Sequence, residues 1–256
     1  MRELFFSQLT TNAMTYCVGM MMDEGLVFLA DSRTNAGVDQ INSFRKLTLF
    51  ERAGDRVLVL LSAGNLAITQ AVIAILKRRL DAEDGTGNLM AAKSMFDAAE
   101  LVGEALRFVY ARDARALKDH NVEFNASFVL GGQIRGEAPR MFSIYAAGNF
   151  IEATDDTRYF QIGESKYGKP IIDRMITATS SLKEAAKCAL VSMDSTIRSN
   201  LSVGPPLDMV LIKTDTLSVH HHVRINVDDE YFQTIRIRWG RALRQAFADL
   251  PDPPFA

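Results

Sequence analysis

The chain has 256 residues, of which 48% are hydrophobic and 23% are charged, so it is long enough for one domain with a substantial core. Its formal net charge is -2 and its basic residues are scattered, which argues against a protein that binds nucleic acid by charge. Two cysteines are too few for a disulfide framework. No apolar run approaches the ~20 residues that a membrane span requires, so we expect a cytoplasmic location.

The first half of the chain predicts two strand hairpins followed by two helices. Short apolar runs flank turn residues at 23–25 and 53–55, as they do in hairpins. Because these runs are apolar at nearly every position, we expect both faces of the sheet that they form to be covered. The next two segments repeat apolar residues at helical spacing. The predicted strands are 16–22, 26–31, 45–50 and 57–62, and the predicted helices are 66–80 and about 89–113.

The second half of the chain predicts strands, then two helices, then a closing strand pair and a last helix. The strands are 125–131, 140–146 and 157–162, the helices about 166–176 and 181–198, the closing strands 208–213 and 218–225, and the last helix about 228–247. Two sheets packed face to face, with a pair of helices on each outer side, accommodate this order in one domain. The sequence therefore predicts the α/β class, as a single four-layer α/β/β/α sandwich over residues 15–247 with a loose tail at 248–256.

Thr15, Asp31 and Lys46 are the residues that point to catalysis. A threonine hydroxyl is a weak nucleophile and needs a base beside it. If Thr15 begins the mature chain, its own α-amino group, with an ordinary pKa of about 8, can be that base without a histidine. A lysine beside the hydroxyl lowers its proton affinity, and an aspartate orients that lysine. Gly64, just after the strand at 57–62, can present an N–H to the developing oxyanion. Each residue alone is typical of a structural role, so the prediction rests on their joint arrangement.

Longer strings around these residues resemble the proteasome β-subunit family, and within it the bacterial ancestral-beta-subunit group. The strings are Met-Thr-Tyr-Cys-Val-Gly-Met, Ala-Asp-Ser-Arg-Thr-Asn-Ala-Gly-Val-Asp, Phe-Arg-Lys, Ser-Ala-Gly-Asn-Leu-Ala and Gly-Glu-Ser-Lys-Tyr-Gly-Lys-Pro. The resemblance covers most of the chain and implies a threonine-type endopeptidase of the N-terminal-nucleophile hydrolase type, without a cofactor or metal. The tract His220–His222 does not change this expectation, because alternate side chains of a strand face opposite ways.

The resemblance also implies roles for individual residues. Thr15 is the nucleophile that forms the acyl-enzyme, and its freed amine is the base. Asp31 and Lys46 form the supporting pair, and Gly64 supplies the oxyanion N–H. The implied catalytic residues are Thr15, Asp31, Lys46, Gly64, Ser165 and Ser202, and the implied substrate-binding residues are Arg33 and Asn35.

Two positions depart from the pattern of that family. Glu164 stands between Gly163 and Ser165, where the family has its serine directly after the glycine. Ser202 matches the serine of the family's Arg-Asp-x-x-Ser-Gly segment, but Ser199 stands in place of the aspartate that helps to position the terminal amine. Two alternatives to an endopeptidase therefore stay open, namely a narrow-specificity amidase of the same type and a catalytically silent assembly scaffold.

Residues 1–14 precede the threonine, and its amine is free only once they are absent. Either they are a propeptide removed by autoprocessing, or translation starts at Met14 and an aminopeptidase removes that methionine. No glycine precedes Thr15, which favours the second route. For partners, the resemblance implies a peptide or unfolded-protein substrate and a homo-oligomer, either a closed ring or an open spiral. A regulatory partner stays open.

Overall fold

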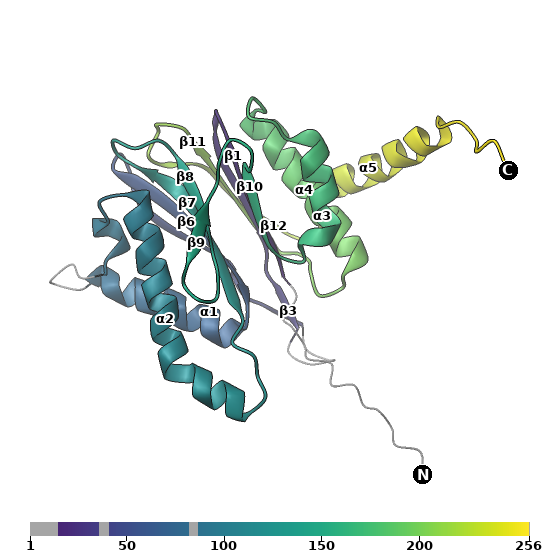
Figure 1. The fold of residues 1–256 in the computed structure, drawn as a ribbon. Coiled ribbons are helices and arrows are strands. Elements are labelled where there is room, and N and C mark those ends of the chain that lie inside the picture. The colour runs from purple at the N-terminus through teal and green to yellow at the C-terminus, as the bar shows by residue number, and fades with distance from the viewer. Residues whose placement is uncertain (1–14, 36–40, 82–86, 256) are drawn as a thin grey trace, which may run out of the picture.

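The fold is built on two five-stranded antiparallel sheets (Figure 1). The computed structural model describes residues 15–35, 41–81 and 87–255, so the expectations for residues 1–14 lie outside the described residues. The strands are β1 (Tyr16–Met22), β2 (Gly25–Asp31), β3 (Arg33–Asn35), β4 (Ile41–Ser43), β5 (Leu47–Arg52), β6 (Arg56–Gly64), β7 (Ala126–Ile134), β8 (Arg140–Ile144), β9 (Phe150–Glu152), β10 (Tyr159–Gly163), β11 (Leu207–Lys213) and β12 (Val219–Ile225). One sheet has the order β10-β1-β2-β11-β12 and the other β5-β6-β7-β8-β9, while β3 and β4 pair separately.

Five α-helices accompany these sheets in the described part of the chain. They are α1 (Leu66–Arg78), α2 (Met95–Asp119), α3 (Ser165–Met175), α4 (Leu182–Ser199) and α5 (Glu230–Ala248), with short 3-10 turns η1 (Arg79–Asp81) and η2 (Leu89–Ala91). The predicted α/β class is therefore confirmed.

Three hydrophobic clusters show how the sheets and helices are stacked. Between the two sheets, Phe28 of β2 meets Leu61 of β6 and Met141 of β8. On the outer face of the β5–β9 sheet, a second cluster includes Val72 of α1 and joins that sheet to α1 and α2. A third cluster, which includes Ala189 of α4, joins the other sheet to α3 and α4. Figure 1 shows α1 and α2 on one side of the paired sheets and α3 and α4 on the other.

The first hairpin brings Thr15 and Asp31 to the same end of a sheet. β1 and β2 pair from Met22 opposite Gly25 to Cys17 opposite Ala30. Every residue of β2 is buried, and so is all of β1 except Met21, which is half-buried. The expectation that both faces of this sheet are covered is thus confirmed, because alternate side chains face the helices and the other sheet.

The boundaries differ from the prediction mainly where elements are short or capped. β3, β4 and β9 have three residues each, too few for a periodic pattern, and were not expected. The predicted helix over 89–113 is instead η2 followed by α2, which runs on to Asp119. Asn88 and Ser94 cap these two elements separately, each accepting an N–H from the turn that follows.

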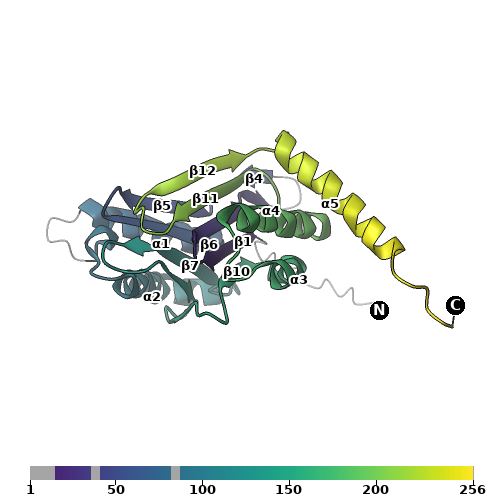
Figure 2. The same ribbon diagram turned by 90° about the horizontal axis from the view of Figure 1, so that it is seen from above.

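Helix α5 leaves the body of the molecule (Figure 2). Its first turns are anchored, since Phe232 is 1% exposed and Arg236 donates to the buried Asp194 of α4 at 2.7 Å. Further along, Leu243 and Phe247 are exposed. Of the helices in the described ranges, none combines the length and the apolar character that crossing a membrane requires.

Candidate functional site

The carboxylate of Asp31 is the centre of the candidate site. Asp31 ends β2 and is completely buried, while Thr15 and Lys46 beside it are 2% and 7% exposed. The oxygen Oδ1 accepts hydrogen bonds from the Thr15 hydroxyl at 3.1 Å and from the Lys46 ammonium at 2.7 Å. The N–H of Tyr16 donates to the same oxygen at 3.1 Å, and the N–H of Gly204 donates to Oδ2 at 3.3 Å. The fold therefore brings together the threonine, aspartate and lysine that the sequence singled out.

Burial and charge act in opposite directions on Asp31. Burial raises the pKa of the Asp31 carboxyl above its ordinary value, and the Lys46 ammonium and the N–H groups of Tyr16 and Gly204 oppose that rise. Lys46 is held a second time, because its ammonium also donates to the carbonyl oxygen of Arg33 at 2.7 Å. The lysine is thus fixed by one charged and one backbone partner, next to the oxygen that the Thr15 hydroxyl contacts.

The carbonyl group of Thr15 is fixed by the end of β10. The N–H of Glu164 donates to the Thr15 carbonyl oxygen at 2.7 Å. Gly163, which pairs with Tyr16 across the strands, has a φ of +83°, and a Cβ atom there would lie 1.9 Å from that oxygen. Because only glycine accepts both this backbone conformation and this approach, Gly163 sets the position of the Thr15 backbone.

Arg33 holds the loop that reaches Asp31 from the other side. Its Nη1 donates to the carbonyl oxygen of Leu201 at 2.9 Å and to that of Val203 at 3.5 Å. Its guanidinium lies against Gly204, where a Cβ atom would be 2.4 Å from the Arg33 Cζ. The side chain that we expected to bind substrate therefore contacts the loop whose Gly204 N–H binds Asp31.

Gly64 is the last residue of β6, and one residue, Asn65, separates it from α1. Its φ is +109°, and a Cβ atom would lie 2.5 Å from the carbonyl oxygen of Asn125. Asn65 then caps α1, accepting the N–H of Ala67 at 3.0 Å. The close approach of the neighbouring strand thus requires glycine here, independently of any contact with substrate.

The other expected site residues are Ser165, Ser202 and Asn35, which lie on three different segments of the chain. Ser165 begins α3, and among the described residues it makes no hydrogen bond to Thr15. Ser202 lies in the loop that Arg33 holds, and its N–H binds the Asn200 side chain at 2.9 Å. Asn35 ends β3, and its side chain is outside the described part.

Sequence reasoning missed several residues that build the site. Tyr16 is fully buried, and its hydroxyl contacts Ser192 of α4 and Gln161 of β10. Gly168 of α3 packs over this group, because a Cβ atom there would lie 2.5 Å from the Tyr16 hydroxyl oxygen. The signals were present as a tyrosine in an otherwise aliphatic strand and as isolated glycines, but their partners are more than 140 positions away. These contacts tie the residue after Thr15 to both neighbouring elements.

No group of three or more potential metal-binding side chains occurs within the described ranges. The three histidines His220–His222 are exposed on β12. The register of β12 with β11 shifts between Leu211 and Ile212, so that Leu211 pairs with His221 and Ile212 with Val219.

Comparisons with known proteins gave strong matches among solved structures. Neither the comparison with models of protein families nor that with curated proteins gave a match. The chain is 53% identical to Anbu (ancestral beta-subunit) from Yersinia bercovieri, with 94% of this chain and all of that one covered and a TM-score of 0.88. It is 51% identical to an Anbu (Gly-1) mutant from Hyphomicrobium sp. strain MC1, covering 93% and 99% of the two chains with a TM-score of 0.87. A structure described as the helical assembly of the Anbu complex from Pseudomonas aeruginosa is 49% identical, with coverages of 94% and 98% and a TM-score of 0.89.

The family resemblance expected from the sequence strings is therefore confirmed along nearly the whole chain. The identities lie far above those at which only the fold is shared, and the matches cover 93–94% of the chain. The chain therefore belongs to the Anbu (ancestral beta-subunit) family of proteasome-like proteins.

Proposed function

We propose that this protein is a threonine-type peptidase of the N-terminal-nucleophile hydrolase type, with Thr15 as its nucleophile. One observation carries the proposal: the Thr15 hydroxyl and the Lys46 ammonium donate to the same buried oxygen of Asp31. A threonine placed only for packing does not need a buried ion pair at its hydroxyl, and such a pair is costly to bury.

The proposed reaction begins with the free α-amino group of Thr15 as general base. It takes the hydroxyl proton while Oγ1 bonds to the substrate carbonyl carbon, and the carbonyl electrons move to the oxygen. The C–N bond then breaks, the leaving amine takes the proton from the α-ammonium, and an ester of Thr15 remains. Water attacks this ester by the same path, releasing the acid and restoring the hydroxyl. The Lys46 ammonium favours the developing negative charge on Oγ1, and Asp31 keeps the lysine in place. Gly64 supplies the N–H for the oxyanion in this proposal.

The α-amine becomes available once the residues before Thr15 are removed. We propose that translation from Met14, followed by loss of that methionine, produces the mature end, with autoprocessing of residues 1–14 as the other route. N-terminal sequencing of protein from its native host distinguishes the two routes. An active protein with an intact Met1 end contradicts both.

The proposal extends to assembly and location. The relative from Pseudomonas aeruginosa is described as a helical assembly, which supports self-association of this chain, and we propose an open spiral in preference to a closed ring. Exposed apolar side chains on α5, such as Leu243 and Phe247, are suited to contacts between copies. Cys17 and Cys188 are free thiols, in keeping with a reducing cytoplasm. The proposed substrates are peptides or unfolded proteins.

A narrow-specificity amidase is the second candidate, and one position favours it. Ser199, at the exposed end of α4, has no carboxylate to hold the terminal amine, so turnover of ordinary peptides is expected to be weak. A protein of this kind keeps the threonine chemistry but accepts few amides.

Cleavage of a peptide library by protein that begins at Thr15 tests the proposal. New amine ends are counted by mass spectrometry, with Thr15→Ala as the inactive control and Thr15→Ser as the conservative variant. Cleavage of many sequences, abolished in Thr15→Ala, supports the peptidase. Cleavage of one narrow class supports the amidase. If protein with a confirmed Thr15 end cleaves no peptide, the peptidase proposal is refuted and a catalytically silent scaffold remains.

A further inference from the structure

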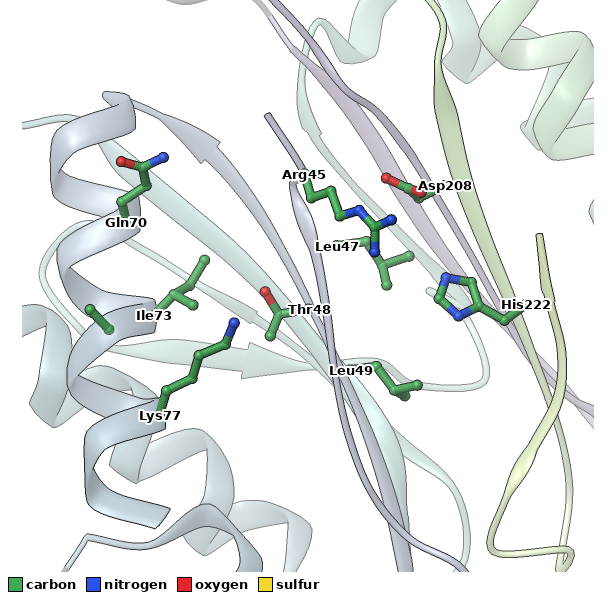
Figure 3. Close-up of a pocket in the computed structure, with 10 residues that line it drawn as sticks. Arg45, Leu47, Thr48, Leu49, Gln70, Ile73, Lys77, Asp208 and His222 are labelled. Carbon is green, nitrogen blue, oxygen red and sulfur yellow. The ribbon is translucent and has the colours of Figure 1, made fainter. Parts of the chain in front are cut away.

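A pocket of about 500 Å³ opens where the free edges of the two sheets approach each other. β5 is an edge strand of one sheet and β12 an edge strand of the other, and α1 closes the far side. Figure 3 shows Lys77 extending from α1 towards Thr48 of β5, and the Arg45 guanidinium pointing towards His222 of β12. The lining therefore comes from three parts of the chain that lie far apart in sequence.

The charge in this pocket is positive, although the chain as a whole carries a net charge of -2. Arg45 and Lys77 line the pocket, and across the described residues neither has an ion pair or hydrogen bond. Asp208 is the one acidic residue in the lining, and it is 2% exposed. Both of its oxygens accept from Nη1 of Arg224, at 2.8 and 2.9 Å. The negative charge of Asp208 is thus already paired with Arg224, so Arg45 and Lys77 are available to another anion.

The apolar part of the pocket lining fits the aliphatic portion of a ligand that ends in a carboxylate. Leu47, Leu49 and Ile73 line the same pocket. A group with a short apolar stem and a terminal carboxylate matches both surfaces, because the stem leaves water while the carboxylate reaches a guanidinium or ammonium. A neutral amide of equal size matches only the apolar surface.

The pocket also adjoins the candidate site along the chain. Arg45 and Leu47 flank Lys46, whose ammonium donates to Asp31. The pocket and the candidate site therefore share the segment 45–47 of the chain.

We propose that this pocket binds a carboxylate of the peptide substrate, with Arg45 and Lys77 providing the charge. This inference rests on the proposed peptidase function. The carboxylate can be that of a glutamate side chain or that of a peptide's C-terminal end, since the chemistry of the two is the same.

Equilibrium binding of three short alanine-based peptides to the full protein tests the inference by calorimetry at low salt. The first has an internal glutamate and an amidated end, the second a glutamine and an amidated end, and the third a glutamine and a free C-terminal carboxylate. We expect the better of the two acidic peptides to bind about tenfold more tightly than the neutral one, the low end of what hydrogen bonds to charged groups contribute. Whichever acidic peptide is favoured identifies the source of the carboxylate.

Arg45→Gln and Lys77→Gln are expected to reduce this preference to about twofold or less, since each removes one of the charged partners. Arg78→Gln is the matched control, because it makes the same charge change on the next residue of α1, which does not line the pocket. Equal urea midpoints for all three variants show that folding is unaffected. The inference is overturned if no peptide binds, if the neutral peptide binds as tightly as both acidic ones, or if Arg78→Gln lowers the preference as much as the two pocket variants.

Mass analysis of the same peptides separates this inference from the peptidase proposal. A carboxylate preference in binding without any cleavage leaves the pocket assignment in place and contradicts the peptidase. Cleavage without a preference for carboxylate contradicts the pocket assignment alone.

Discussion

Replacing Lys46 by methionine is the sharpest test of how the site is held together. Methionine keeps most of the length of the side chain but removes the ammonium that lies 2.7 Å from the fully buried Asp31. Removing one partner of a buried ion pair costs about 3–5 kcal/mol, because the remaining charge has no counterion. The hydroxyl of Thr15 and the N–H groups of Tyr16 and Gly204 still donate to the carboxylate, so we expect about 3 kcal/mol, at the lower end.

The cost of Lys46→Met is expected to depend on pH in a definite direction. Burial already raises the pKa of Asp31, and loss of the ammonium raises it further. With a folded pKa above the unfolded one, ionised Asp31 weakens the fold at neutral pH, and that penalty disappears as the pH falls and the carboxyl takes up a proton. The variant should therefore lose more stability, relative to the parent, at pH 7.5 than at pH 5.

Urea unfolding at a fixed protein concentration measures both effects, since self-association makes stability concentration-dependent. Asp31→Asn provides the control background, in which Lys46→Met no longer leaves a buried charge. There it should cost less than about 1 kcal/mol and show no dependence on pH, because replacing a whole buried pair is often close to neutral. The reasoning is refuted if Lys46→Met lowers the free energy of unfolding of the parent by less than about 0.5 kcal/mol, as a surface change would. It is also refuted if the loss is equal in both backgrounds.

Three further predictions follow from other contacts. Gly163→Ala forces a positive φ and a clash with the Thr15 carbonyl oxygen, so we expect a loss of at least about 1–2 kcal/mol in urea unfolding; unchanged stability contradicts this role. Arg33→Met removes the hydrogen bonds to the loop at 201–204, and hydrogen–deuterium exchange at the Gly204 N–H should quicken; exchange at the parent rate shows that the loop holds itself. Burial raises the pKa of Cys188 to about 11, so a disulfide reagent at pH 7.5 should modify it only after unfolding, and rapid native modification contradicts its burial.

That Thr15, Asp31 and Lys46 lie close together could be predicted from the sequence, because these residues lie on segments that follow one another in the chain. The hairpin of β1 and β2 brings Thr15 to Asp31 across a single turn, and Lys46, which contacts the same carboxylate, follows Asp31 by only 15 positions. Alternating and continuous apolar runs are enough to predict such strands.

The rest of the site depends on contacts that no local pattern encodes. Gly204 reaches Asp31 from 173 positions away, and its glycine-proline context indicated only the end of a helix. Gly163 is required by the carbonyl oxygen of Thr15, which becomes apparent only when β10 pairs with β1. For Arg33, the family resemblance implied a role in substrate binding, and in the structure its hydrogen bonds are to a backbone loop. Tertiary contacts of this kind have no sequence period to reveal them.

Covalent labelling of the mature protein tests the central claim that Thr15 is an activated N-terminal nucleophile. A peptide epoxyketone reacts with both the hydroxyl and the free amine of a terminal threonine, so intact mass reports the two groups together. We predict one adduct per chain on protein shown to begin at Thr15, no adduct on Thr15→Ala, and slower labelling of Lys46→Met. The absence of an adduct on a confirmed Thr15 end, or equal labelling of Thr15→Ala, contradicts the claim.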